Sequence, residues 1–179
     1  KVFGTIEGQV SRMERLVEQL LNLSKVENNR DDDNMVAVNM PILVENLVED
    51  ARWLNQDKQH QIRTNIAQDI GVFGIETELK SACTNLISNA IKYRDNNKVS
   101  KIEIYSKLQK DGTLITVQDN GIGIKAEHQS KVYNMFFVTN SSNKGTGLGM
   151  YIVKDAIQQM NASISLESTY GSGTRFDVF

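Results

Sequence analysis

The 179-residue sequence has little cysteine, little net charge and no long hydrophobic run, and each absence excludes a class of protein. The single cysteine, Cys83, excludes a disulfide framework and a zinc site built from several cysteines. No apolar run approaches the roughly 18 residues that a membrane span needs. Since 20 Lys and Arg oppose 22 Asp and Glu, the net charge of −2 gives no field that would recruit nucleic acid or an anionic membrane.

Proline and histidine are also scarce, whereas glycine is concentrated in one part of the sequence. One proline and two histidines, His60 and His128, stand against 12 glycines. Five of these glycines fall between Gly121 and Gly149. Because glycine reaches backbone conformations that other residues avoid, we expect the backbone of this segment to have a special role.

Residues 1–28 are predicted to form one long, coiled-coil-like helix. Apolar residues recur there at a spacing close to a heptad seam, at Ile6, Val10, Met13, Val17 and Leu20. A single helix cannot bury such a seam, so we expect it to pair with another helix; packing on its own domain is the alternative. A polar, acidic stretch follows, which divides the chain into a helix at 1–28, a linker at 29–35 and a domain at 36–179.

Residues 36–179 mix strand and helix patterns and predict an α+β fold, a two-layer sandwich of a mixed sheet covered by helices. We expect a loop around Gly71 and Gly74 and a mobile loop at 140–144, which ends the polar and weakly periodic segment 125–144. Helices are expected from Asn39–Pro41 to Leu54, at 76–93 and at 148–160. Strands are expected at 35–38, 62–66, 101–108, 114–118, 163–167 and 174–179, with the last four forming two hairpins.

A polar constellation lies on the predicted helix 76–93. Asn85 and Asn89 are four residues apart, which places both amides on one face, and Lys92, Tyr93 and Arg94 follow at the helix end. These groups could meet a phosphate chain and its metal, since an amide oxygen is a hard ligand suited to Mg²⁺. A polar helix flank without a ligand is the alternative.

Two glycine-rich motifs follow. The sequence DNGIGI at 119–124 comes directly after a predicted strand and suits recognition of the polar edge of a flat ligand. It also matches a loose dinucleotide-binding pattern, which we reject because its glycines do not lead into a βαβ unit. The sequence KGTGLGM at 144–150 opens a predicted helix, where successive backbone N–H groups can point at an anion; a glycine-rich helix cap is the alternative.

Five segments, taken in order, resemble the N, G1, F, G2 and G3 boxes of sensor histidine kinases: ELKSACTNLISNAIKYR, DNGIGI, VYNMFF, KGTGLGMYIVK and YGSGTRF. These kinases belong to the GHKL ATPase superfamily, with gyrase, mismatch-repair and heat-shock chaperone proteins, and have the Bergerat ATP-binding fold. The resemblance spans about residues 36–179. Residues 1–28 resemble the second helix of the family's dimerisation and phosphotransfer hairpin.

The resemblance implies roles for the residues at the end of helix 76–93. Asn89 would coordinate Mg²⁺, and Asn85, one turn earlier, would line the phosphate site. Lys92 and Arg94 would contact phosphates, and Tyr93 would flank the nucleotide. Asn85, Asn89 and Lys92 would carry catalysis, chiefly by positioning ATP and stabilising charge.

The resemblance also assigns the glycine-rich segments to an ATP pocket. Asp119 would accept a hydrogen bond from the adenine amino group, with Gly121, Gly123 and Ile124 around it and Thr174 near the base. The phosphate side would be formed by Lys144, Gly145, Thr146, Gly147, Leu148 and Gly149.

The F box and its neighbours show how this sequence differs from the family. Phe136 fits the F box, which tethers the mobile ATP lid, here about 125–144, and we include it among the nucleotide-site residues. Tyr133 stands where the first aromatic of the box is usually Phe. Arg94 occupies a position where a small hydroxyl residue is common, which would add charge near the phosphates.

The resemblance predicts an ATP-dependent protein-histidine kinase that passes the γ-phosphoryl group of ATP to a histidine and then to an aspartate of a response regulator. The resemblance places the acceptor histidine on a helix preceding residue 1. Neither His60 nor His128 fits as a replacement, since neither lies on a heptad helix with the acidic neighbour that the acceptor motif needs. We therefore expect this chain to bind ATP and Mg²⁺ without phosphorylating itself.

The resemblance also implies partners and a location. We expect homodimer formation through the N-terminal helical hairpin of the full protein, a receiver domain as partner and a cytoplasmic location, with no nucleic acid and a membrane only through segments absent here. An ATP-sensing or scaffold module without kinase activity stays open, as does a serine-directed anti-sigma kinase. The gyrase and chaperone branches are less favoured, since Asn85 stands where they use a glutamate.

Overall fold

The computed structural model describes residues 35–54, 60–68, 70–139 and 145–179. The predicted helix at 1–28, all of the linker except Met35, and Lys144 lie outside these described residues. No helix within the described ranges is both long and apolar enough to span a bilayer.

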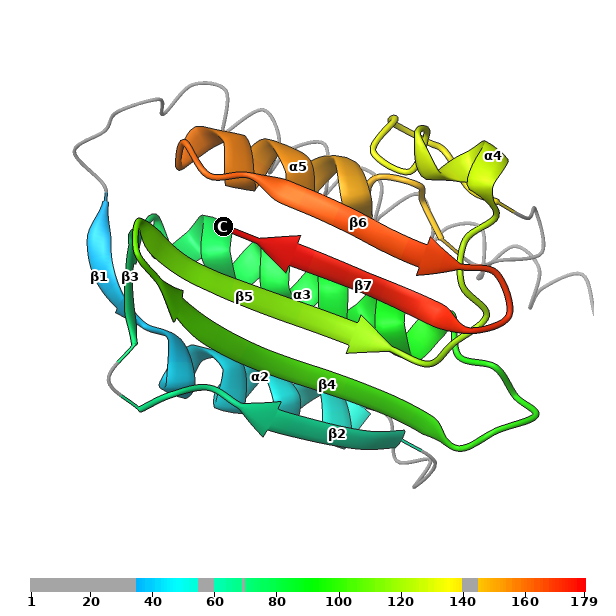
Figure 1. Cartoon of the computed structure of the whole chain (residues 1–179), viewed down its shortest axis with the longest axis horizontal. Coiled ribbons are helices and arrows are strands. Elements are labelled where there is room, and N and C mark those ends of the chain that lie inside the picture. The colour runs from blue at the N-terminus through cyan, green and yellow to red at the C-terminus, as the bar shows by residue number, and fades with distance from the viewer. Residues whose placement is uncertain (1–34, 55–59, 69, 140–144) are drawn as a thin grey trace, which may run out of the picture.

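The described residues form a five-stranded sheet with helices packed on one face (Figure 1). Its strand order is β2 (His60–Asn65), β4 (Ser100–Gln109), β5 (Gly112–Asp119), β7 (Gly173–Val178) and β6 (Ile164–Thr169). The pair β2 and β4 is parallel and the other three pairs are antiparallel. The covering helices are α2 (Met40–Leu54), α3 (Glu76–Lys92) and α5 (Gly149–Gln159). The predicted mixed sheet in an α+β fold is therefore confirmed.

A second, two-stranded sheet corrects the prediction of a loop around Gly71 and Gly74. There β3 (Gly71–Gly74) pairs antiparallel with β1 (Val36–Asn39), with Val36 opposite Gly74. The four residues of β3 are too few for a period-two pattern, and glycine at both ends reads as a turn. Pairing with a strand more than thirty positions earlier overrides that local signal.

The helix starts follow the sequence signals closely. The side-chain Oδ1 of Asn39 accepts a hydrogen bond of 3.2 Å from the Ile42 N–H, so Asn39 caps α2 as predicted. Helix α3 has no side-chain cap, but Glu76 and Glu78 in its first turn suit the positive end of the helix dipole. It turns one apolar face inward through Leu79, Ala82, Cys83, Leu86, Ile87, Ala90 and Ile91.

The core lies between the sheet and the helices. Alternate residues of β4 point into it, with Ile102 and Ile104 almost fully buried, and Val153 and Ile157 of α5 meet the same layer from the helix side. This packing fixes the face of α3 that points inward, and therefore also the polar face that points outward.

The core position of Ile104 gives a test of the packing. Ile104→Ala should lower the free energy of unfolding by about 2–5 kcal/mol, because it removes buried methyl groups and leaves a cavity. Leu108→Ala on the same strand is the matched control: Leu108 is 72 % exposed against 1 % for Ile104. It should change that free energy by less than about 0.5 kcal/mol in urea unfolding. Equal losses for both variants would contradict the packing described.

Candidate nucleotide-binding site

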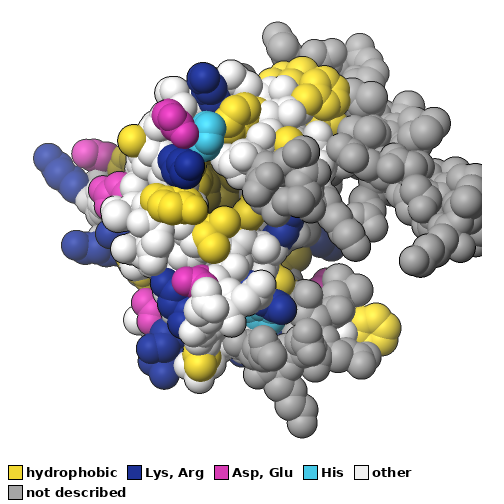
Figure 2. Space-filling model, turned by 90° about the vertical axis from the view of Figure 1, so that its right-hand side faces the viewer, with side chains coloured by type: hydrophobic (Ala, Val, Ile, Leu, Met, Phe, Trp, Pro, Cys, Tyr) yellow, Lys and Arg dark blue, Asp and Glu magenta, His cyan; other side chains and the backbone are white. Residues whose placement is uncertain are grey.

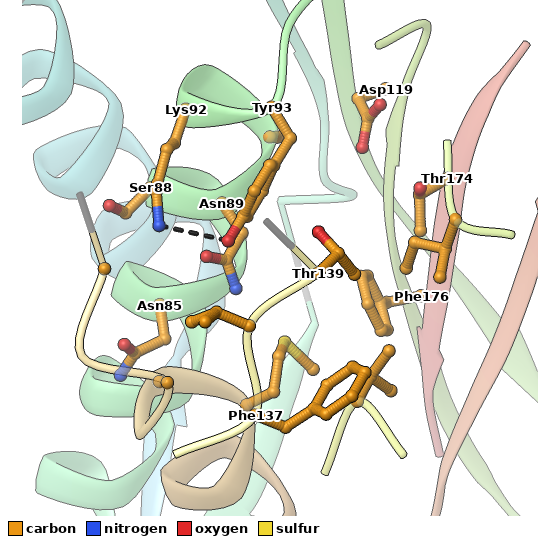
Figure 3. Close-up of a pocket in the computed structure, with 18 of the residues that line it drawn as sticks. Asn85, Ser88, Asn89, Lys92, Tyr93, Asp119, Phe137, Thr139, Thr174 and Phe176 are labelled. Carbon is orange, nitrogen blue, oxygen red and sulfur yellow. Dashed lines mark hydrogen bonds between the residues drawn. The ribbon is translucent and has the colours of Figure 1, made fainter. Parts of the chain in front are cut away.

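A cavity of about 290 Å³ opens where β5 ends and β7 begins. Figure 3 shows its two main walls, with α3 on one side and strands β5 and β7 on the other, and with Phe137 and Thr139 between them. Figure 2 looks onto this end of the molecule and shows hydrophobic side chains gathered around a hollow. The cavity therefore has polar groups on both walls and an apolar lining between them.

Two carboxamides on α3 face the cavity as the sequence predicted. Asn85 donates from Nδ2 to the Ser81 carbonyl oxygen at 2.9 Å, which leaves its Oδ1 on the side of Gly149. The Asn89 carboxamide lines the cavity and makes no hydrogen bond to any residue that the structure describes. The Asn85 amide is thus oriented by a hydrogen bond, whereas the Asn89 amide, one turn further along the same wall, is available to a ligand.

Lys92 and Tyr93 form the rim at the end of α3. The Lys92 ammonium donates to the Tyr93 hydroxyl at 3.0 Å and lies 4.6 Å from the centre of its ring. A Cβ added to Gly145 would lie 2.2 Å from the Lys92 Nζ, so the glycine-rich segment passes directly beside this cation. Lys92 is exposed and therefore available to an anion in the cavity.

Arg94 was predicted to contact phosphates, but it does not line the cavity. Its guanidinium donates from Nη1 to His60 Nε2 at 3.1 Å and from Nε to Asn96 Oδ1 at 3.0 Å. His60 in turn hydrogen-bonds Ser100 through Nδ1 at 3.0 Å. The guanidinium is thus engaged by groups around β2 and the start of β4.

Asp119 is the acidic group of the opposite wall. Burial raises the pKa of its carboxyl to about 6, while hydrogen bonds from the backbone N–H groups of Gly121 and Thr174, and the charge of Lys98, oppose this rise. The Gly121 N–H donates to Asp119 Oδ1 at 2.7 Å. At neutral pH the group is therefore a carboxylate held in place by the backbone, able to accept a hydrogen bond from a ligand.

The glycines after Asp119 serve the close approach of backbone segments. Gly121 does not line the cavity, whereas Gly123 and Ile124 do. Gly123 has a φ of +66°, and a Cβ there would lie 2.1 Å from the Thr169 carbonyl oxygen. A side chain at this position would therefore push the loop away from the turn between β6 and β7.

The segment before α5 forms the other end of the cavity. Gly145, Thr146, Gly147 and Gly149 line it, and the first N–H groups of α5 have no partner within the helix. Such a helix N-terminus attracts anions. Leu148, also predicted here, is fully buried and does not line the cavity.

The F-box residue Phe136 does not line the cavity either; its neighbour Phe137 does. Phe136 is 56 % exposed and has a φ of +61°. Gly147, with a φ of +77°, packs against the Phe136 backbone, which a Cβ would approach to 2.5 Å. This contact ties the F-box segment to the glycines before α5.

Sequence reasoning missed nine of the lining residues, and two of these, Ile122 and Met150, stand within the glycine-rich motifs. The nine come from α3, from the loops, from the start of α5 and from β7: Ser88, Ala90, Ile122, Val132, Phe137, Val138, Thr139, Met150 and Phe176. Phe176 could have been found, because it stands two residues after Thr174 on one strand and so shares its face. Ser88, Ala90 and Met150 depend on which helix positions turn toward the cavity, and the rest depend on how the loops fold over it.

The described residues contain no cluster of three His, Cys, Asp or Glu side chains that could hold a metal ion. The cavity instead offers the uncommitted amide of Asn89. One neutral oxygen suits Mg²⁺ only where phosphate oxygens and water complete the shell, which is how this ion binds in nucleotide sites. The donor set therefore fits Mg²⁺ that arrives with a phosphate chain.

Comparison with known proteins agrees with this geometry. Residues 74–179 match the family described as histidine kinase-, DNA gyrase B- and HSP90-like ATPase. The phosphate regulon sensor protein PhoR of Haemophilus influenzae is 33 % identical over 180 residues, which cover 98 % of this chain and 41 % of that protein. PhoR of Pseudomonas aeruginosa is 31 % identical over 175 residues, covering 96 % of this chain and 39 % of that protein.

Solved structures show the same fold. The histidine kinase AdeS of Acinetobacter baumannii has a TM-score of 0.78 at 23 % identity, covering 98 % of this chain and 81 % of that one. Full-length ShkA in complex with AMPPNP has a TM-score of 0.78 at 19 % identity, covering 92 % of this chain and 34 % of that one.

Fold and cavity together define an ATP-binding domain with a carboxylate at one end and a helix N-terminus at the other. The chain belongs to the histidine kinase-, DNA gyrase B- and HSP90-like ATPase family, and within it resembles the sensor histidine kinases, as the sequence motifs predicted. It spans about two fifths of the length of the curated relatives compared above.

The buried carboxyl of Asp119 predicts a pH dependence of stability. Its pKa rises from 3.8 to about 6 on folding, so between these values the folded state binds the proton more tightly than the unfolded state. The free energy of unfolding should therefore fall as pH rises from about 4 to about 6, by on the order of 2 kcal/mol from this group.

Urea unfolding at several pH values, with Asp119→Asn beside the natural protein, measures this contribution. Asp119→Asn should remove that fall, whereas Asp111→Asn in the exposed turn between β4 and β5 should keep it. Parallel stability curves for the natural protein and Asp119→Asn would contradict the burial of this carboxyl.

Proposed function

We propose that this chain is the ATP-binding catalytic part of a two-component sensor histidine kinase. It binds ATP with Mg²⁺ and presents the γ-phosphoryl group to a histidine on a dimerisation hairpin, for relay to an aspartate of a response regulator. The observation that carries the proposal is the pairing of Asp119 with the N-terminus of α5 at opposite ends of one cavity.

At the base end, the Asp119 carboxylate accepts a hydrogen bond from the amino group of adenine. The apolar lining supports this assignment, because Ile122, Val132 and Phe176 offer apolar surroundings of the kind that a purine ring needs. Thr174 is buried beside Asp119, with its hydroxyl on the same side of the cavity (Figure 3).

At the phosphate end, the N–H groups at the start of α5 and the Lys92 ammonium hold the phosphate chain. Asn89 supplies an oxygen to Mg²⁺, with Asn85 one turn away on the same wall. Mg²⁺ held there would neutralise charge on the phosphoryl oxygens. These residues position the γ-phosphoryl group and stabilise charge, which is the main contribution a protein makes to phosphoryl transfer.

The attacking histidine belongs to a segment outside these 179 residues. Arg94 and Ser100 occupy both ring nitrogens of His60, and the His128 ring packs on Phe137 with a buried Nδ1. In the transfer, an imidazole nitrogen forms a bond to the γ-phosphorus. At the same time the bond between the γ-phosphorus and the β–γ bridging oxygen breaks, and ADP leaves. A receiver-domain aspartate then takes the phosphoryl group as the N–P bond breaks.

The proposal extends to partners and location. The full protein forms a homodimer through its N-terminal helical hairpin, binds a response-regulator receiver domain and works in the cytoplasm. Residues 1–28 supply one helix of the hairpin, and any membrane anchor belongs to segments beyond this sequence. These assignments rest on the heptad pattern and on the similarity to PhoR.

The decisive experiment is phosphorylation in trans. The chain is incubated with a separately prepared hairpin of the full protein, labelled ATP and Mg²⁺; it should label the hairpin with acid-labile, base-stable phosphate and should not label itself. A hairpin whose acceptor histidine is changed to glutamine, and a reaction with EDTA, are the controls and should stay unlabelled.

Two outcomes would contradict the kinase proposal. Binding of ATP without any label on the hairpin would favour the ATP-sensing or scaffold module. Label that resists acid would indicate transfer to a hydroxyl residue, as in a serine-directed kinase.

A further inference from the structure

A hydrogen-bond network stands behind the base end of the cavity, and none of the sequence motifs includes its two central residues. Ser168, on β6, accepts a hydrogen bond from the Ile124 N–H at 2.8 Å and donates to the Gly173 carbonyl oxygen at 2.9 Å. Its Oγ also lies 3.0 Å from Thr174 Oγ1. One hydroxyl thereby joins the loop after β5 to the start of β7.

The proton positions in this network follow by elimination. A serine hydroxyl has one proton and two lone pairs, and a carbonyl oxygen can only accept. The proton of Ser168 therefore points to Gly173, and one lone pair takes the Ile124 N–H. The remaining lone pair accepts from the Thr174 hydroxyl, whose oxygen then turns its own lone pairs toward the cavity beside Asp119.

Gln129 holds the same loop from the other side. Its Nε2 lies 2.9 Å from the Ile124 carbonyl oxygen and 2.9 Å from the Ser168 carbonyl oxygen. Because both partners only accept, the amide uses both of its protons to join the end of α4 (Ala126–Gln129) to β6. Ile124, which lines the cavity, is thus held through its N–H by Ser168 and through its carbonyl by Gln129.

We propose that Ser168 and Gln129 are positioning residues for nucleotide binding, with different effects on the base. Ser168 orients the Thr174 hydroxyl so that the base end presents two acceptors, the Asp119 carboxylate and the Thr174 oxygen. Gln129 sets the position of the Ile124 wall without affecting that orientation. The inference rests on the proposed binding of ATP and adds a source of selectivity for a purine edge that carries an amino group over one that carries an oxo group.

The test measures dissociation constants for ADP, inosine diphosphate and tripolyphosphate. Ser168→Ala frees the Thr174 hydroxyl to donate into the cavity, so ADP should bind about three- to tenfold more weakly, and its preference over inosine diphosphate should shrink by a similar factor. Tripolyphosphate, which has no base, should bind as before. Ser168→Thr keeps the hydroxyl and should restore the preference.

A second variant distinguishes the effect of the position of the Ile124 wall from the effect of the direction of the Thr174 hydroxyl proton. Gln129→Met removes both N–H donors at nearly constant size, so both diphosphates should weaken by a similar factor while tripolyphosphate does not. Ser165→Ala, at an exposed position on the same strand, is the matched control and should leave all three constants unchanged. If Ser168→Ala does not fold, Gln129→Met and Ser168→Thr still test whether the network affects ligands that carry a base without affecting tripolyphosphate.

The outcomes distinguish this inference from the proposed function. A natural protein that binds no ADP would overturn the ATP site itself. Normal binding of ADP with unchanged constants in Ser168→Ala and Gln129→Met would overturn only the positioning roles. Equal weakening of ADP and tripolyphosphate would also overturn them, because the network would then support the fold rather than the base end.

Discussion

Two hydrogen bonds donated by backbone N–H groups of the loop after β5 fix the geometry on which the rest of the site depends. The Gly121 N–H donates to the Asp119 carboxylate at 2.7 Å, and the Ile122 N–H donates to the Tyr93 carbonyl oxygen at the end of α3 at 3.0 Å. The first holds a buried carboxylate in place, and the second holds the loop against the helix that carries Asn85 and Asn89. The backbone of this loop therefore ties the two polar walls together, by a main-chain contact to α3 and by a main-chain donor to the Asp119 side chain.

The two ends of the cavity differ in the kind of groups that would hold a ligand there. Under the proposed function, the base end is the partly desolvated one and few groups define it: Asp119, and Thr174 with the orientation that we propose Ser168 gives it. The phosphate end opens beside an exposed lysine and a helix N-terminus, where charge and dipole act with little need for fixed side chains. At this second end, Gly147 packs against the backbone of Phe136 in the F-box segment so closely that no room is left for a side chain.

Much of this arrangement could be predicted from the sequence, because its signals are local. Helix periodicity placed Asn85 and Asn89 on one face, and the hydrophobic run before Asp119 placed this residue at the end of a strand. The failures concern residues whose orientation is set by distant partners. Arg94 binds His60, which is more than thirty positions away; Leu148 is buried in the core although it lies between two lining glycines; and β3 exists only through its pairing with β1. No pattern within a few residues contains that information.

The central claim is that one cavity binds a purine at Asp119 and a metal–phosphate chain at Asn89. Its most direct test is isothermal titration of adenosine and of magnesium tripolyphosphate into the natural protein, Asp119→Asn and Asn89→Ala, with folding checked by circular dichroism. The account predicts that Asp119→Asn weakens adenosine by at least about tenfold and leaves tripolyphosphate within about twofold, and that Asn89→Ala does the reverse. Loss of both ligands in both variants, or of neither ligand in either variant, would contradict it.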